Sequence, residues 1–260
     1  EFQQNVKKLT KQDPVQGITQ AGIGLGGSTN IERYSDILSV LMMQNGATMM
    51  DGKQVLFNTI PPTAQDTKYN PGLEALRFYI DFSNPGKEVY SWNSDLPNSL
   101  NLFISGKLAM MFGYSYHAAT IKAQAPKLNF SISALPQIEG SPVEVNFANY
   151  WVESVSKKSK YPNEAWDFIQ FATKEEQVKS YLTKTKKPTA LRSLIASQRE
   201  DNDLSVFASE LLTAKSWYRG KDANAAEVAI GEMIDNARQN PNKILDAINT
   251  GAAKVQQTVN

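Results

Sequence analysis

The sequence predicts an α/β fold in which helices outnumber short strands. Two stretches support this prediction, because each reads as a short apolar strand, a glycine-containing turn and then a helix. The first strand covers 18–25 and leads through GGSTN into a helix over 31–44. The second runs from Leu108 to Phe112 and leads through Gly113 into a helix over 115–124. Ligands bind at the carboxyl edge of open α/β sheets, so we expect the loop after Phe112 to form one wall of a ligand cleft.

Caps and turn residues define the other elements of the first half. Asp51-Gly52 lies between apolar flanks, which predicts a hairpin with a type I′ turn. Asn70-Pro71 is a cap followed by a first-turn proline, which predicts the start of a helix. Helices are expected over 1–9, 70–82 and 94–106, and the hairpin over 49–58.

Periodicity defines the second half. Apolar and polar residues alternate over 128–136, which is typical of a strand, and the spacing of Thr173 and Glu176 predicts a capping box. We expect Trp166 to lie in the core, on the apolar face of an amphipathic helix. Strands are expected over 128–136 and 150–155, and helices over 161–173, 173–183, 204–213, 225–238 and from 241 to the end.

The composition excludes several classes of function. The chain carries 27 basic and 26 acidic residues in 260, which argues against binding nucleic acid or a membrane surface. It has no cysteine and one histidine, His117, which excludes cysteine nucleophiles, zinc clusters and triads that need a second histidine. We therefore expect no metal and no cofactor. No apolar run approaches the ~18 residues that a membrane span needs.

The first residues suggest a segment taken from a longer protein. The helix expected over 1–9 has no capping residue before Glu1, and no signal peptide precedes it. If the protein is exported, an export segment would have to lie outside this sequence. The lack of cysteine is compatible with an exported protein that has no disulfides.

Four segments occur in a characteristic order: SGKLAMMFG, LPQIEG, NYWVESVSKKSKYPNEAWDFIQFATKEEQ and NPNKILDAINTGAAKVQQ. No one of them is decisive, but together they resemble the family 1 extracellular solute-binding proteins. These are the maltose-binding-protein-like receptors of ABC importers. The resemblance extends over essentially the whole chain.

The resemblance implies a class II periplasmic-binding-protein-like fold, with two lobes that close on a ligand about a hinge. It implies that residues 1–132 and 188–260 form a complete second lobe and that 133–187 are a remnant of the first. The chain would cross between lobes near Leu135-Pro136 and Lys187-Pro188. The rest of the first lobe would be another chain, or would have been lost by trimming.

The resemblance also implies a carbohydrate ligand, the transmembrane subunits of an ABC permease as partners, and no catalysis. The protein would be extracellular or periplasmic, a lipoprotein anchored through residues before Glu1. Sugars are bound by aromatic faces together with hydrogen bonds from amide and carboxylate groups. The candidate ligand-binding residues are Tyr114, Tyr116, Trp217, Tyr150, Trp151, Asn149, Trp92, Asn30, Glu32, Arg33 and His117.

Other interpretations stay open at this point. Each candidate aromatic side chain has packing as its alternative role. The same fold could bind a peptide, a polyamine or a phosphodiester. A carbohydrate hydrolase would need paired carboxylates ~5 to 9.5 Å apart, and no acidic pair has a suitable apolar setting in this sequence. A structural or adhesive module is a more remote alternative.

Overall fold

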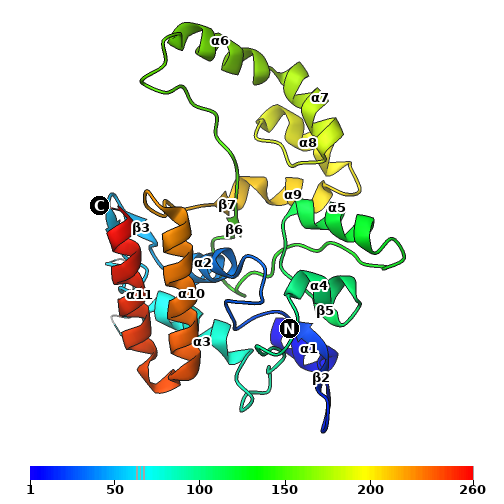
Figure 1. Ribbon diagram of the computed structural model, residues 1–260, viewed down its shortest axis with the longest axis vertical. Coiled ribbons are helices and arrows are strands. Elements are labelled where there is room, and N and C mark those ends of the chain that lie inside the picture. The colour runs from blue at the N-terminus through cyan, green and yellow to red at the C-terminus, as the bar shows by residue number, and fades with distance from the viewer. Residues whose placement is uncertain (63, 65, 67, 260) are drawn as a thin grey trace.

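The computed structural model describes residues 1–62, 64, 66 and 68–259. Figure 1 shows a main body that contains both ends of the chain and an arm that extends away from it. The body combines short strands with helices, as expected for an α/β chain. The longer helices are α1 (Phe2–Leu9), α2 (Tyr34–Gln44), α3 (Pro71–Asp81), α5 (Ser115–Gln124), α6 (Pro162–Ala172), α7 (Glu175–Thr185), α10 (Ala223–Gln239) and α11 (Ile244–Val259).

A three-stranded sheet positions the site. Its order is β1 (Lys11–Asp13), β2 (Gly17–Ile23) and β5 (Leu108–Met110), with β1 antiparallel and β5 parallel to β2. Because β2 and β5 are parallel, their carboxyl ends meet at one edge of the sheet. The GGSTN loop and the loop after Phe112 therefore start side by side, although they lie far apart in the sequence.

One hydrophobic core joins the beginning and the end of the chain. It includes Leu25 from the loop after β2, Leu76 from α3, Ile234 from α10 and Ile248 from α11, all fully or almost fully buried. The helices α10 and α11 approach closely because Gly251 has no side chain; a Cβ there would lie 2.6 Å from Met233 Sδ. No residue between Met111 and Trp217 belongs to the buried part of this core.

The predicted hairpin is confirmed, but its turn type is wrong. β3 (Met50–Asp51) pairs with β4 (Gln54–Val55), so Gly52 and Lys53 are the two turn residues. A type I′ turn needs a positive φ at both, and only Gly52 has one. The expected helix over 94–106 is shorter, α4 (Ser99–Ile104), because Asn98 caps it after Pro97.

The two strands expected over 128–136 and 150–155 do not form. Leu128, Phe130 and Ile132 are half-buried and the residues between them are exposed, so the alternation is present. Neither segment pairs with a neighbouring strand among the described residues. The prediction failed because alternation shows which face of a segment is buried and does not show whether a partner strand exists. The strand observed nearby is β6 (Asn146–Phe147), which pairs in parallel with β7 (Ala214–Lys215).

The chain stays beside the body as far as Ala148 and then continues into the arm. The side chain of Gln44 on α2 donates to the backbone oxygens of Pro136 and Val145, and Ala148 N donates to Lys215 O. The arm carries α6 and α7 and returns through η1 (Arg192–Leu194), α8 (Ile195–Arg199), α9 (Ser205–Glu210) and η2 (Leu211–Thr213). In the body, η3 (Pro241–Lys243) precedes α11.

The expected core position of Trp166 is wrong. Helix α6 has no buried residue, and Trp166 is 48% exposed beside Phe168 and Phe171, which are also exposed. The helix is amphipathic as predicted, but nothing in the described structure covers its apolar face. The capping box is also wrong, because Thr173 Oγ1 donates to Ile169 O in α6 and does not accept from α7.

Candidate functional site

The site lies where the loops after β2 and β5 meet the first turn of α2. Gly26 in the first loop has a φ of 96°, and a Cβ there would lie 2.7 Å from Ser83 N. Only glycine fits this position, which lets the loop turn tightly before α2. The loop after β5 brings Tyr114 to the same place, because Tyr114 is the residue from which α5 begins.

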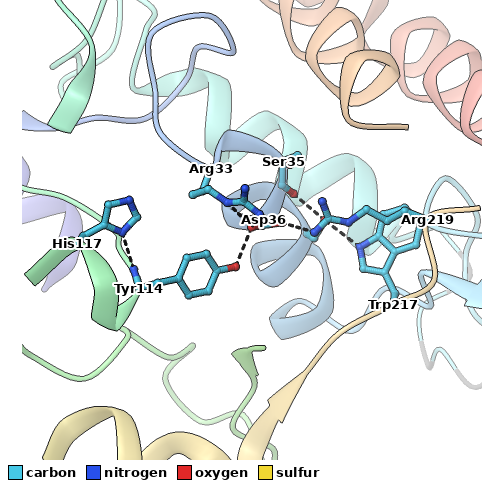
Figure 2. Close-up of polar contacts among 8 residues, drawn as sticks. Arg33, Ser35, Asp36, Tyr114, His117, Trp217 and Arg219 are labelled. Atoms are coloured by element: carbon cyan, nitrogen blue, oxygen red, sulfur yellow. Dashed lines mark hydrogen bonds and ion pairs between the residues drawn. The ribbon is translucent and has the colours of Figure 1, made fainter. Parts of the chain in front are cut away.

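A buried carboxylate, Asp36, connects three parts of the chain (Figure 2). Its Oδ2 accepts from Arg33 Nε at 2.8 Å, Arg33 NH2 at 2.6 Å and the Tyr114 hydroxyl at 2.7 Å. Its Oδ1 pairs with the guanidinium of Arg219, from the loop between β7 and α10. Asp36 is only 3% exposed, so these contacts are shielded from water. Its position in the first turn of α2 also suits a negative charge, because the helix dipole is positive there.

Trp217 is fixed on the other side of α2. Its indole Nε1 donates to Ser39 Oγ at 3.0 Å, and Phe57 packs edge-on against its ring. The guanidinium of Arg219 lies over the rings of Trp217 and Phe147, 5.9 and 5.7 Å from their centroids. The loop that carries Trp217 and Arg219 is therefore held to α2 by both a hydrogen bond and an ion pair.

Arg33 has a strained backbone. It precedes α2 in the left-handed region, with φ 59° and ψ 30°, which residues other than glycine rarely adopt. Burial lowers the pKa of its guanidinium, but Asp36 outweighs this and the net shift is upward. Strain of this kind is concentrated at functional sites. The side chain is 28% exposed, so part of the guanidinium faces outward.

Three aromatic rings extend the site from Tyr114. The rings of Tyr114 and Tyr116 stack at 5.8 Å, and the ring of His117 lies 4.1 Å from that of Tyr116. Burial raises the pKa of the Tyr114 hydroxyl, and Asp36 raises it further, so the hydroxyl remains a donor. Tyr116 is 48% exposed and forms the open end of the cluster.

His117 is expected to make stability depend on pH. Its Nδ1 accepts from Tyr114 N at 2.9 Å, which suits the neutral ring, and burial lowers its pKa below 6.5. The unfolded chain then binds more protons below about pH 6.5, so the free energy of unfolding should fall as the pH drops from 7 toward 5. NMR titration of this single histidine measures the pKa directly. His117→Gln should reduce the loss of stability, and a measured pKa above 6.5 would contradict the prediction.

The structure brings together five of the sequence-predicted residues. Arg33, Tyr114, Tyr116, His117 and Trp217 belong to the cluster around Asp36 or contact its members. Glu32 lies beside them, with Oε1 accepting from Asn98 Nδ2 at 3.0 Å. Tyr150 reaches the same region from the arm, since its hydroxyl lies 3.4 Å from Ser216 Oγ.

Four predicted residues lie elsewhere. Trp92 is fully buried and its indole donates to Asn30 Oδ1, while Asn30 Nδ2 donates to two backbone oxygens. These hydrogen bonds stabilise the loop after β2 from its buried side, so Trp92 and Asn30 are not part of the proposed site. Asn149 and Trp151 are exposed at the start of the arm, with Trp151 94% exposed.

Sequence reasoning missed Asp36, Arg219, Ser39 and Phe147. The sequence could have indicated Asp36, because it follows Arg33 by three residues and would share a helix face with it. Arg219 lies two residues after Trp217 and could have been included with it. Phe147 and Ser39 had no such indication, because their roles depend on which loops meet in space. Within the described residues, no group of histidine, aspartate or glutamate could hold a metal ion.

Comparison with known proteins identifies the family. The profile of the bacterial extracellular solute-binding proteins matches residues 1–179. The chain belongs to this family. Members of the family are binding proteins and not enzymes. A search among curated protein sequences gives no match.

Solved structures of solute-binding proteins share the fold. A cyclo/maltodextrin-binding protein in complex with maltotetraose aligns with a TM-score of 0.72 and 18% identity, over 99% of this chain and 63% of that one. A solute-binding protein of an ABC transporter from Thermotoga lettingae, bound to α-D-tagatose, gives 0.68 and 16%, over 100% and 64%. The maltotriose-binding protein of Thermus thermophilus gives 0.62 and 16%, over 98% and 64%. This solute-binding protein thus has the periplasmic-binding-protein-like α/β fold and spans less than two thirds of the length of these structures.

Proposed function

We propose that this chain is part of the substrate-binding receptor of an ABC transporter, which captures a sugar or oligosaccharide between two lobes and delivers it to a membrane permease. The cluster around Asp36 supports this proposal most strongly. It places the exposed ring of Tyr116 and the partly exposed guanidinium of Arg33 beside each other at the carboxyl edge of the sheet. An aromatic face next to fixed hydrogen-bond donors is what a sugar ring requires.

The charges of the site favour a neutral ligand over the charged alternatives. Two guanidiniums, Arg33 and Arg219, share the carboxylate of Asp36, and Glu32 supplies a second negative charge nearby. A polyamine would need carboxylate oxygens that are free to accept, but those of Asp36 are occupied by donors and Oε1 of Glu32 accepts from Asn98. A phosphodiester would favour guanidiniums that lack a carboxylate partner. The near balance of positive and negative charges at the site therefore supports a carbohydrate ligand.

We propose that residues 1–132 and 188–260 form one lobe and that 133–187 begin the other. The shared core is the support for this division, because none of its buried members comes from 133–187, while the start of that segment stays in contact with α2 through Pro136 and Val145. The exposed apolar face of α6 would then pack against the rest of the other lobe. Closure of the lobes would bring the start of the arm, with Asn149, Tyr150 and Trp151, toward the ligand.

An extracellular or periplasmic location and a lipid anchor are part of the same proposal. The family is extracellular by its description. Among the described helices, none combines the length and the apolar character required to cross a bilayer.

Saturation-transfer difference NMR on the 260-residue chain tests the proposed ligand class, because it detects the weak binding expected of a single cleft wall. The panel contains maltotriose, mannobiose and tagatose, together with spermidine, a tripeptide and a glycerophosphodiester. We expect transfer to at least one carbohydrate, reduced in Arg33→Ala. Transfer only to the amine, the peptide or the phosphodiester would overturn the carbohydrate assignment.

A further inference from the structure

A second polar surface lies where the arm returns to the body. A depression of about 270 Å³ is lined by Arg192, Ile195, Ala196, Arg199 and Leu212. The first four come from η1 and α8, and Leu212 comes from η2, which follows α9. Figure 1 shows α8 between α7 and α9, and none of these residues belongs to the cluster around Asp36.

The two arginines of the depression differ from the other arginines of the chain. Of the six arginines, Arg33, Arg77, Arg219 and Arg238 each contact a carboxylate. Arg192 and Arg199 are exposed, and among the described residues neither guanidinium has a hydrogen bond or an ion pair. Their guanidinium donors are therefore available to a partner.

The segment around the depression contains only slightly more basic than acidic residues. From Glu175 to Asp203 the chain carries six basic and five acidic residues. Three of the acidic residues have partners, since Asp201 pairs with Lys186, Asp203 pairs with Lys122, and Glu175 accepts from the hydroxyl of Ser193. Glu176 and Glu200 are exposed. The attraction for an acidic partner therefore comes from the two unpaired guanidiniums and not from a basic field.

The floor between the arginines is apolar. Two of the lining residues are large apolar side chains, Ile195, which is 8% exposed, and Leu212, which is 58% exposed. Arg192 and Arg199 lie seven positions apart, two helical turns, which separates them by ~10 Å along the axis. A small anion would use one guanidinium and leave the apolar floor uncovered. A peptide with two carboxylates two turns apart and an apolar side chain between them would engage all three features.

We propose that this depression is a docking site for an acidic segment of a partner protein, with two carboxylates ~10 Å apart that flank an apolar side chain. The carboxylates would each accept two hydrogen bonds from a guanidinium, and the apolar side chain would cover Ile195 and Leu212. This surface is separate from the proposed carbohydrate site, so either proposal can fail without the other.

Fluorescence anisotropy with a labelled peptide tests the proposal on the full 260-residue chain. The probe is a helical peptide of about 16 residues, long enough to be partly helical, with glutamates seven apart and leucine between them. A second peptide has glutamine in place of both glutamates. We expect binding of the first peptide only, at least 10-fold weaker in the double variant Arg192→Gln/Arg199→Gln and weakened by Leu212→Ser.

The double variant Lys157→Gln/Lys158→Gln is the matched control, because it removes the same charge from exposed positions outside the depression. It should change the affinity less than 2-fold. An equal loss in the control would show unspecific electrostatics and overturn the proposal. So would the absence of peptide binding. The peptide could fail to bind while the two arginines are needed for binding of phosphatidylglycerol vesicles or for self-association in sedimentation. Either result would assign the surface to another occupant and overturn the proposal.

Discussion

Replacing Asp36 with asparagine is expected to lower the free energy of unfolding by about 3 kcal/mol, because it breaks a buried ion pair. The amide keeps the shape of the side chain but removes its charge and turns an N–H₂ group toward donors. Arg33, Arg219 and the Tyr114 hydroxyl then compete for one acceptor oxygen in a buried setting. Urea unfolding measures the loss, and the melting temperature should fall by about 6–12 °C.

Glu74→Gln is the control for this substitution. Glu74 also pairs with an arginine three positions away, Arg77, but both side chains are 38–47% exposed. Exposed pairs contribute little, so the control should lose less than about 0.5 kcal/mol. If Asp36→Asn lost no more than the control, the view of Asp36 as the connection between the three segments would be wrong.

Replacing Trp217 with alanine is expected to weaken binding of the carbohydrate found in the NMR panel by ~10-fold or more, because one stacked aromatic ring contributes on the order of 1.5 kcal/mol. The change removes a possible stacking face and also the hydrogen bond that holds the loop to Ser39. Trp217→Phe keeps a ring and loses the N–H, so its effect should be smaller. Titration of the ligand signals gives both affinities.

Trp166→Ala separates this effect from a general loss of aromatic surface. Trp166 lies on α6 with 48% of its surface exposed, and it makes no contact with the cluster around Asp36. Its replacement should leave the affinity of the 260-residue chain unchanged within 2-fold. Equal weakening by Trp166→Ala and Trp217→Ala would remove Trp217 from the proposed site. Thermal unfolding of each variant confirms that the chain is folded.

The candidate site was predictable where a local pattern placed a residue at a strand end. Tyr114, Tyr116 and His117 follow β5 within a few residues, and Arg33 follows the loop after β2, so the sheet brings them together. Asp36 and Arg219 were missed because a carboxylate and a guanidinium 183 positions apart leave no joint signal in the sequence. The burial of Trp92 against Asn30 also has no local signal, because the two residues are 62 positions apart.

The fold was predictable in its helices more than in its strands. Caps and apolar periodicity are local properties, and α3 and α5 begin where the sequence predicted. Strand formation requires a partner, and the segments over 128–136 and 150–155 have none within the described structure. The expected core position of Trp166 failed for a related reason. Amphipathic spacing gives the direction of a side chain and not the surface that covers it.

The sequence alone determined the helices, the hairpin, the turn after β5 and the resemblance to the solute-binding family, because each depends on residues that are close along the chain. Only the tertiary structure decided that Asp36 joins Arg33, Tyr114 and Arg219, and that Trp92 lies in the core and donates a hydrogen bond to Asn30. The physical reason is that burial and ion pairing depend on which distant segments meet. That is set by the packing of the whole chain around its core, and no short stretch contains it.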